Sequence, residues 1–175
     1  LGSLMIHHTS GVWVIPAADE GERPAIPEPE QVAAVVTFLR EHFDAVVLAG
    51  GGFSDTTIAA LNQAHIIHVV SSLDFLSLRR ALSVLTRLRD LGVAESALRV
   101  VVNRHDRGGD LTLADAKEAL GSPVAWSLPN DSRVADKAVN EGVSIISLGK
   151  GRLQAAFEEY AGRLDERLAD LIERV

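Results

Sequence analysis

Glycines and small polar residues stand where the chain leaves an apolar run, and they are the first candidates for chemistry. Gly50 to Gly52 and Ser54 precede a predicted helix, where backbone N–H groups and the helix dipole can hold an anion. A Walker phosphate loop also needs a Lys and then Ser or Thr after its glycines, and no Lys lies near these. The glycine spacing also differs from the dinucleotide fingerprint. We therefore interpret this segment as a tight turn whose glycines permit positive φ.

Histidines are the next candidates, because they are common metal ligands. His65 and His68 are three residues apart at a predicted strand, so their side chains should face opposite sides of a sheet. His7 and His8 form a pair near the start of the sequence, and no Cys or well-placed carboxylate completes a site. No Ser occupies a G-x-S-x-G nucleophile elbow either. We predict no metal site, no catalytic triad and no catalytic residue.

Composition narrows the class of protein. The chain has 175 residues, 47% of them hydrophobic and 23% charged, which suits a single globular domain over residues 1–175. A formal net charge of -7 argues against a broad surface for nucleic acid or anionic lipid, so small molecules and proteins are the expected partners. The sequence has no Cys, no membrane-spanning apolar run and no signal peptide pattern, so we expect a cytoplasmic protein without an integral membrane segment.

Strands and helices are predicted to alternate along the chain. The predicted strands cover residues 11–15, 44–49, 66–70, 98–102 and 123–128, with a short edge strand at 144–147. The predicted helices cover residues 29–42, 54–63, 73–91, 112–120 and 151–173, and one more begins at Ser132. This alternation predicts an α/β fold with three layers, in which a doubly wound, mostly parallel sheet lies between helices.

In such a sheet, ligands bind outside the carboxyl ends of the strands. The segments expected at that edge are residues 50–54, 71–74, 103–106 and 129–133, which are all polar or rich in glycine. The last predicted helix has an apolar stripe that should dock on the core: Leu153, Phe157, Tyr160, Leu164, Leu168, Leu171 and Val175. Its polar face is acidic, which argues against a membrane-surface helix and leaves a dimer or partner helix as the other possibility.

Five segments form a pattern that runs over nearly the whole chain. They are His8–Pro16 (HTSGVWVIP), Phe43–Leu48 (FDAVVL), Leu73–Arg79 (LDFLSLR), Val100–Arg104 (VVVNR) and Leu128–Gly142, which begins LPND and ends AVNEG. In this order the segments resemble the ParA/MinD superfamily of deviant Walker P-loop ATPases. The resemblance is strongest to the CpaE/TadZ-type proteins of Flp (Tad) pilus assembly.

The resemblance implies a P-loop NTPase-like fold and a site for ATP or ADP. By the resemblance, Asn103 and Arg104 would flank the adenine, and Pro129, Asn130 and Asp131 would line the base side of the pocket. An Asn side chain suits this role because it can both donate to and accept from an adenine edge. The resemblance further implies a homodimer with protein partners in a pilus or secretion assembly, recruited to a membrane-associated machine.

Two features depart from the family pattern. The phosphate loop of the family, with its Lys residues, precedes the segment matched by His8–Pro16 and would lie upstream of Leu1, and Mg²⁺ is expected only with that loop. The carboxylate that usually follows the segment matched by Phe43–Leu48 is replaced by Ala49. Phosphoryl transfer depends on positioning and charge neutralisation, so the resemblance implies weak or absent hydrolysis.

The same departures predict that the chain is the C-terminal part of a longer protein. In this family the strand that carries the phosphate loop lies inside the sheet, so upstream residues, another segment or a subunit should fill its place. Two alternatives stay open. One is a genuine ATPase whose phosphate loop lies upstream of this fragment. The other is a flavodoxin-like small-molecule enzyme that uses residues 50–54 to hold an anion.

Overall fold

The structure is a computed structural model that describes residues 5–16, 27–106 and 108–172. Of the predicted stripe on the last helix, the side chain of Leu171 and residue Val175 lie outside the described part. The chain divides into two compact units, Leu1–Ala64 and His65–Val175.

The first unit begins with a small hairpin. Strands β1 (Ile6–His7) and β2 (Trp13–Val14) pair antiparallel, and the N–H of His8 donates to the carbonyl of Val12 at 2.8 Å. Gly11 closes the turn with φ +89°, a conformation that favours glycine. The sequence predicts a strand at residues 11–15 within the parallel sheet. That prediction is wrong about the pairing, because the strand belongs to a separate two-stranded sheet.

Two helices complete the first unit. Helix α1 (Pro29–His42) starts as predicted, with Pro at its first turn and a capping box between Glu28 and Gln31. Helix α2 (Asp55–Leu61) follows Ser54, whose hydroxyl accepts from the N–H of Thr57 at 3.2 Å. Gln63 ties the two helices together, since its amide donates to the carbonyl of Ala33 at 3.0 Å. Val36 and Leu39 are the hydrophobic residues buried among the described part of this unit.

The predicted strand at residues 44–49 does not form. These residues have no strand partner in the described structure, and Val47 is 91% exposed. A strand exists only through hydrogen bonds to a neighbour, and the apolar sequence cannot supply that neighbour. The prediction is therefore wrong for this structure, although the residues have the composition of a buried strand.

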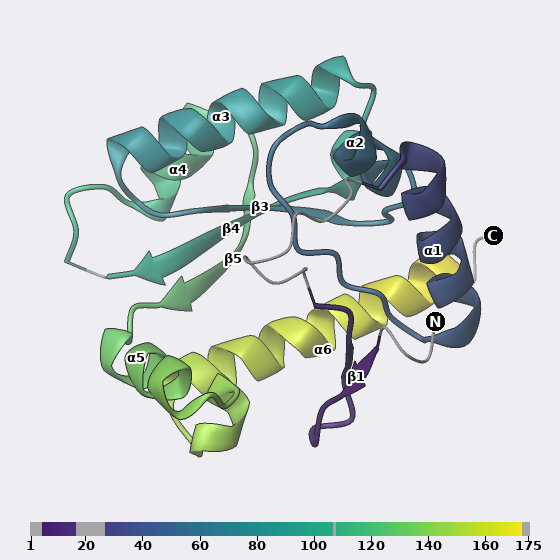
Figure 1. Cartoon of the computed structure of the whole chain (residues 1–175). Helices are drawn as coiled ribbons and strands as arrows, with labels where there is room; N and C mark the ends of the chain where they lie inside the picture. The colour runs from purple at the N-terminus through teal and green to yellow at the C-terminus, as the bar shows by residue number, and fades with distance from the viewer. Residues whose placement is uncertain (1–4, 17–26, 107, 173–175) are drawn as a thin grey trace. The chain divides into compact units, whose positions relative to one another are not determined.

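A parallel sheet forms the centre of the second unit (Figure 1). Its strands are β3 (Ile67–Ser71), β4 (Leu98–His105) and β5 (Val124–Pro129), in the order β3-β4-β5. Val69 of β3 pairs with Val100 of β4, so both side chains lie on one face of the sheet. The three predicted strands are confirmed, and so is their parallel pairing.

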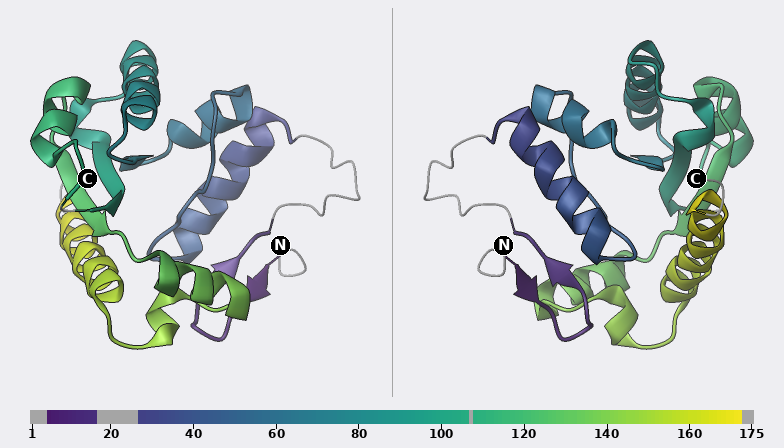
Figure 2. Two further views of the ribbon diagram at one scale, coloured as in Figure 1. Left: turned by 90° about the vertical axis from the view of Figure 1, so that its left-hand side faces the viewer. Right: turned by 90° about the vertical axis from the view of Figure 1, so that its right-hand side faces the viewer.

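Helices cover both faces of this sheet (Figures 1 and 2). They are α3 (Phe75–Asp90), α4 (Leu113–Leu120), α5 (Ser132–Glu141) and α6 (Arg152–Ile172), with short 3-10 helices η1 (Glu95–Ala97) and η2 (Ile145–Leu148). On the side of α3 and α4, Leu85, Val102, Ala116 and Leu120 are at most 1% exposed and form the main core. On the side of α6, Val101, Leu128 and Leu153 form a second cluster. The α/β class with helices on both sides of a parallel sheet is thus confirmed.

The helix boundaries follow local signals in the sequence. Thr112 and Asp115 form a capping box at the start of α4, and Gly121 ends that helix with φ +58°. Asp74 caps α3, where its carboxylate accepts from the N–H of Ser77 at 2.8 Å. The predicted edge strand at residues 144–147 is wrong, because η2 begins there and the hydroxyl of Ser144 accepts from the N–H of Ile146.

Candidate functional site

The end of β4 is irregular. The pairing of β4 with β5 shifts register between Val102 and His105, so Asn103 and Arg104 form a bulge. Arg104 has φ +53°, which is unusual for a residue with a side chain. The N–H of Arg104 donates to the Oδ1 of Asn103 at 2.9 Å and holds this turn. A strained backbone conformation persists only when the surrounding structure holds it in place. Residues in such conformations are concentrated at functional sites.

The loops after β4 and β5 are joined by hydrogen bonds. The N–H of Asn130 donates to the carbonyl of His105 at 3.1 Å, and the Nδ2 of Asn130 donates to the Oδ2 of Asp106 at 2.8 Å. His105 is also the register partner of Pro129. These contacts fix the Asn130 side chain at the carboxyl edge of the sheet, where parallel α/β proteins bind ligands.

Asp131 begins α5. Its carboxylate accepts from the N–H of Val134 at 3.2 Å, which is the N-cap interaction. The first turn of α5 therefore faces the same edge of the sheet as Asn130, and its backbone N–H groups carry partial positive charge. Asp131 has a structural role in this position whether or not it also contacts a ligand.

The structure brings the five predicted site residues to one edge. Asn103, Arg104, Pro129, Asn130 and Asp131 all lie at the carboxyl ends of the adjacent strands β4 and β5. Asp106 completes this group through Asn130, and the sequence contained a signal for it, because Asp106 lies within the segment that follows β4. The left-handed backbone of Arg104 had no signal, since Gly or Asn is the usual residue there.

The other two segments predicted at the edge contribute differently. Asp74 is used to cap α3, and its hydrogen bonds with Ser77 lower the pKa of its carboxyl. Gly52 has φ +79° and precedes the Ser54 cap of α2, so the glycine segment forms a turn into a helix of the first unit. The prediction of a turn with positive φ is confirmed.

The described residues of the candidate site do not provide the donor set of a magnesium ion. Mg²⁺ in nucleotide sites is held by carboxylate and hydroxyl oxygens, and Ala49 offers no side-chain oxygen. Among the described residues, no group of three or more His, Cys, Asp or Glu side chains is placed to hold a metal ion.

An aromatic group lies on the α6 side of the sheet. The ring of Tyr160 stacks on Trp126 with centroids 5.5 Å apart, and the guanidinium of Arg163 lies 4.5 Å from the Trp126 ring. The Nε1 of Trp126 donates to the carbonyl of Ala156 at 3.1 Å. His68 completes the group, and partial desolvation lowers the pKa of its imidazole while it raises the pKa of the Tyr160 phenol. The group explains how α6 is fixed to β5.

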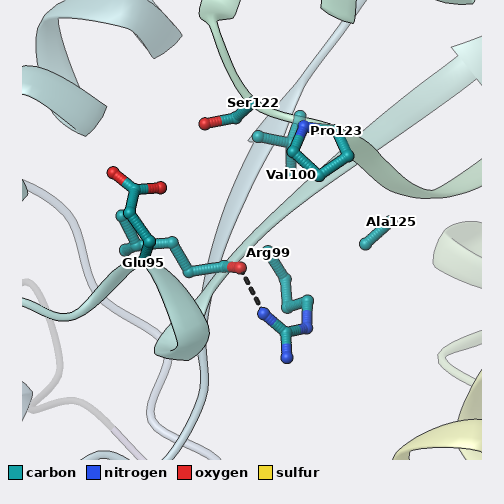
Figure 3. A pocket seen from close by; sticks show the side chains of 7 residues that line it. Glu95, Arg99, Val100, Ser122, Pro123 and Ala125 are labelled. Atoms are coloured by element: carbon teal, nitrogen blue, oxygen red, sulfur yellow. Dashed lines mark hydrogen bonds between the residues drawn. The ribbon is translucent and has the colours of Figure 1, made fainter.

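A small pocket lies at the opposite, amino end of the strands (Figure 3). Its volume is about 180 Å³, and it is lined by Glu95, Leu98, Arg99, Val100, Ser122, Pro123 and Ala125. The Nη1 of Arg99 donates to the carbonyl of Leu98 at 2.5 Å. Arg89 of α3 reaches the same region, where it pairs with Glu95 and donates to the Oγ of Ser122 at 2.7 Å. These bonds tie α3, η1 and the turn before β5 together, which is a structural role.

Comparisons by sequence give no match for this chain. No protein-family model matches the chain, and no curated protein sequence matches it.

No helix in the described ranges combines the length and apolar character that a bilayer crossing requires.

Solved structures of ParA and MinD proteins do match. A ParA family ATPase from Chlorobium tepidum TLS has a TM-score of 0.81 at 20% identity, over 91% of this chain and 66% of that chain. MinD in the MinC:MinD cell division complex of Aquifex aeolicus has a TM-score of 0.77 at 20% identity, over 93% of this chain and 67% of that chain. The septum site-determining protein MinD of Pyrococcus horikoshii OT3, solved with Mg-ADP, has a TM-score of 0.76 at 18% identity, over 94% of this chain and 68% of that chain.

The chain therefore spans about two thirds of the length of these proteins. At identities of 18 to 20% the similarity is one of fold. This chain has the α/β fold of the ParA and MinD ATPases.

Proposed function

We propose that this chain is the nucleotide-base half of a ParA/MinD-like protein of the CpaE/TadZ type. Such a protein would act in the assembly or localisation of a pilus or secretion machine by nucleotide-linked dimerisation and partner binding. The observation that carries the proposal is the cluster of Asn103, Arg104, Asn130 and Asp106 at the carboxyl edge of a sheet with the ParA and MinD fold.

The cluster suits binding better than catalysis. Asn130 is held by Asp106 and presents an amide, which has both donors and an acceptor for an adenine edge. Asn103 and Arg104 sit on the neighbouring strand, where they would flank the other side of the base. Pro129 and Asp131 border Asn130 in sequence and complete this side of the pocket. The nucleotide would be ATP or ADP, as in the MinD protein solved with Mg-ADP.

Weak or absent hydrolysis follows from Ala49. A carboxylate at this position would organise charge around the phosphates, and alanine cannot replace it. The protein would then change its oligomeric state with nucleotide and recruit partners without rapid turnover. The MinD protein of the MinC:MinD complex is an example of this fold in a complex with a partner protein.

A direct test uses ADP and ATP titrated by calorimetry, with sizing of the same samples. The protein tested should be the natural full-length protein, since this chain spans two thirds of its structural relatives. Asn130→Ala should weaken nucleotide binding roughly tenfold, as expected when a side chain that forms hydrogen bonds with the base is lost. Lys137→Ala, on the exposed side of α5, is the matched control and should leave the affinity unchanged.

Three results would contradict the proposal. Turnover at rates of about 1 to 10 per second, ordinary for enzymes, would contradict weak hydrolysis and favour a genuine ATPase. That second candidate is supported by the one third of the ParA and MinD chains that this chain does not span. Equal affinity of the wild type and of Asn130→Ala for ATP and ADP would show that Asn130 is not part of a nucleotide-base site. Tight binding of inorganic phosphate or FMN without ATP would favour the small-molecule enzyme.

A further inference from the structure

Helix α3 buries one side and turns a basic side to solvent. Its buried residues are Leu78, Ala81, Leu85 and Leu88, at the helical spacing of three and four. The residues on the opposite side include Leu76, Arg79, Arg80 and Arg87, which we call the α3 basic face. All four are exposed, and Leu76 is 62% exposed.

The α3 basic face is unusual in an acidic protein with 24 acidic and 17 basic residues. Within the part of the chain that the structure describes, Arg79 and Arg87 form no ion pair, whereas Arg89 of the same helix is paired with Glu95. Arg80 lies near Asp74, which already caps the helix. Guanidinium groups bind carboxylates with two parallel hydrogen bonds, so the α3 basic face fits an acidic partner.

Helix α6 carries the complementary charge. Its sheet side holds Leu153 and Phe157, and its solvent side exposes Glu158, Asp165 and Glu166, which we call the α6 acidic face. Glu158 accepts a hydrogen bond from the neutral amide of Gln154 at 2.9 Å. The neighbouring Glu159 is excluded from the face because it already pairs with Arg163 at 3.0 Å.

The two faces match in spacing. Arg80 and Arg87 are seven residues apart on α3, and Glu158 and Asp165 are seven residues apart on α6. Seven residues rise about 10.5 Å along a helix, so two charge pairs can form when the helices lie side by side. Glu166 of the α6 acidic face can form a third charge pair with Arg79 of the α3 basic face.

The two faces cannot meet within one molecule. Helices α3 and α6 lie on opposite sides of the β3-β4-β5 sheet (Figures 1 and 2). A contact between two different surfaces of identical copies is heterologous, and it continues from copy to copy unless a ring closes. We propose that the α3 basic face of one copy docks on the α6 acidic face of a second copy, so that the chain assembles head to tail.

An anionic membrane is the rival occupant of the α3 basic face. Membrane recognition by charge typically uses clusters of about four to eight basic residues, whereas this face has three. The net charge of -7 also repels an anionic surface as a whole. The acidic helix of a second copy offers discrete carboxylates at the spacing of the arginines, and it is therefore the better occupant of the α3 basic face.

Sedimentation without nucleotide tests the proposal. The wild-type, full-length protein should show a weight-average mass at least twice that of one copy at roughly 50 mM salt, and the mass of one copy at roughly 0.5 M salt, because salt screens exposed charge pairs. Leaving out nucleotide keeps this outcome separate from the nucleotide-linked dimerisation proposed above. A monomer under both conditions would overturn the head-to-tail contact and leave the base site untouched.

Charge reversal identifies the surfaces. Arg80→Glu with Arg87→Glu should abolish the assembly, and so should Glu158→Arg with Asp165→Arg. The two double variants mixed in equal amounts should associate again, and one chain carrying all four substitutions should recover self-assembly. Lys117→Glu with Lys137→Glu changes the net charge as much as Arg80→Glu with Arg87→Glu does, but at exposed sites outside both faces. This control should assemble like the wild type. Circular dichroism checks that each variant is folded.

Two further outcomes would contradict the proposal. Failure of the four-substitution chain and of the mixture to associate, with folded variants, would show that the two faces do not contact each other. Cosedimentation of a monomeric wild type with phosphatidylglycerol vesicles, lost in Arg80→Glu with Arg87→Glu, would assign the α3 basic face to a membrane instead.

Discussion

The Nε2 of His68 lies 2.7 Å from the hydroxyl of Tyr160, a hydrogen bond between residues 92 positions apart. It joins β3 to α6, and the two rings meet edge to face with centroids 5.6 Å apart. Because Tyr160 also stacks on Trp126 of β5, this pair connects the two outer strands of the sheet through one helix. The pair is one of the contacts that hold α6 against the sheet.

The same pair predicts a pH dependence of stability. Desolvation, and then the positive charge of Arg99, lowers the pKa of His68 below its usual 6.5. Between the two pKa values the unfolded chain binds more protons at His68 than the folded chain does. The contribution to stability is therefore complete above pH 6.5, and it is lost as the pH falls through 6.5 toward the lower pKa of the folded state.

Urea unfolding from about pH 5 to about pH 8 measures this effect. The free energy of unfolding should fall more steeply below pH 6.5 in the wild type than in His68→Gln. Tyr160→Phe keeps the ring stack and should retain part of the slope. Equal slopes in the wild type and in His68→Gln would show that His68 does not carry the effect.

The positive φ of Arg104 predicts that replacing this residue with glycine stabilises the chain. Its left-handed backbone, with φ +53°, costs about 1 to 2 kcal/mol for a residue with a side chain. Arg104→Gly removes this cost but adds about 0.5 to 1 kcal/mol of chain entropy in the unfolded state. We expect a net gain of up to about 1.5 kcal/mol in the free energy of unfolding, and weaker nucleotide binding. Arg104→Val should lose stability, and a valine variant as stable as the glycine variant would contradict the assignment.

Asp131 allows structural and binding roles to be separated. Asp131→Ala should cost about 1 kcal/mol of stability, because α5 loses its N-cap. Asp131→Ser keeps a capping oxygen and should unfold at nearly the wild-type urea concentration. If Asp131 also lines the base pocket, calorimetry should show weaker ADP binding in both variants. A serine variant as unstable as the alanine variant would mean that the cap is not what Asp131 contributes.

Two glycines in helical surroundings should respond in opposite ways to alanine. A Cβ added to Gly162 or to Gly121 would meet nothing within 4 Å, so space does not distinguish them. Gly162 lies inside α6, and Gly162→Ala should stabilise the chain by about 0.5 to 1 kcal/mol. Gly121 ends α4 with φ +58°, and Gly121→Ala should destabilise it by about 1 kcal/mol. Thermal unfolding of the pair checks the signs, and equal shifts would contradict the backbone argument.

The helices were the most predictable part of the fold. Glu28 with Gln31, Thr112 with Asp115 and the glycine at 121 are local signals, and each acts within a few residues in the structure. The buried strands β3, β4 and β5 were predictable because continuous apolar runs alternate with these helices.

Pairing between strands was harder to predict. Residues 44–49 have the apolar run of a buried strand, but they remain unpaired in the described structure. Residues 144–147 have β-branched isoleucines, but the Ser144 cap starts a turn of 3-10 helix there. A strand requires a neighbour, which local sequence does not encode.

The candidate site could be located but not built from the sequence. The rule that ligands bind at the carboxyl ends of parallel strands points to Asn103 and Asn130. The bulge at Arg104 and the bond from Asn130 to Asp106 depend on how β4 and β5 meet, which only the folded chain shows.

The two units bury very different numbers of hydrophobic side chains, so we expect them to unfold separately. Among the described residues, the buried hydrophobic side chains of the first unit are Val36 and Leu39, and the other fifteen lie in the second unit. Amide hydrogens of α1 and α2 should therefore exchange with solvent through local opening, at low free energy. Those of β4 should exchange only when the second unit unfolds as a whole. A protease should accordingly cut within α1 and α2 long before it cuts β4.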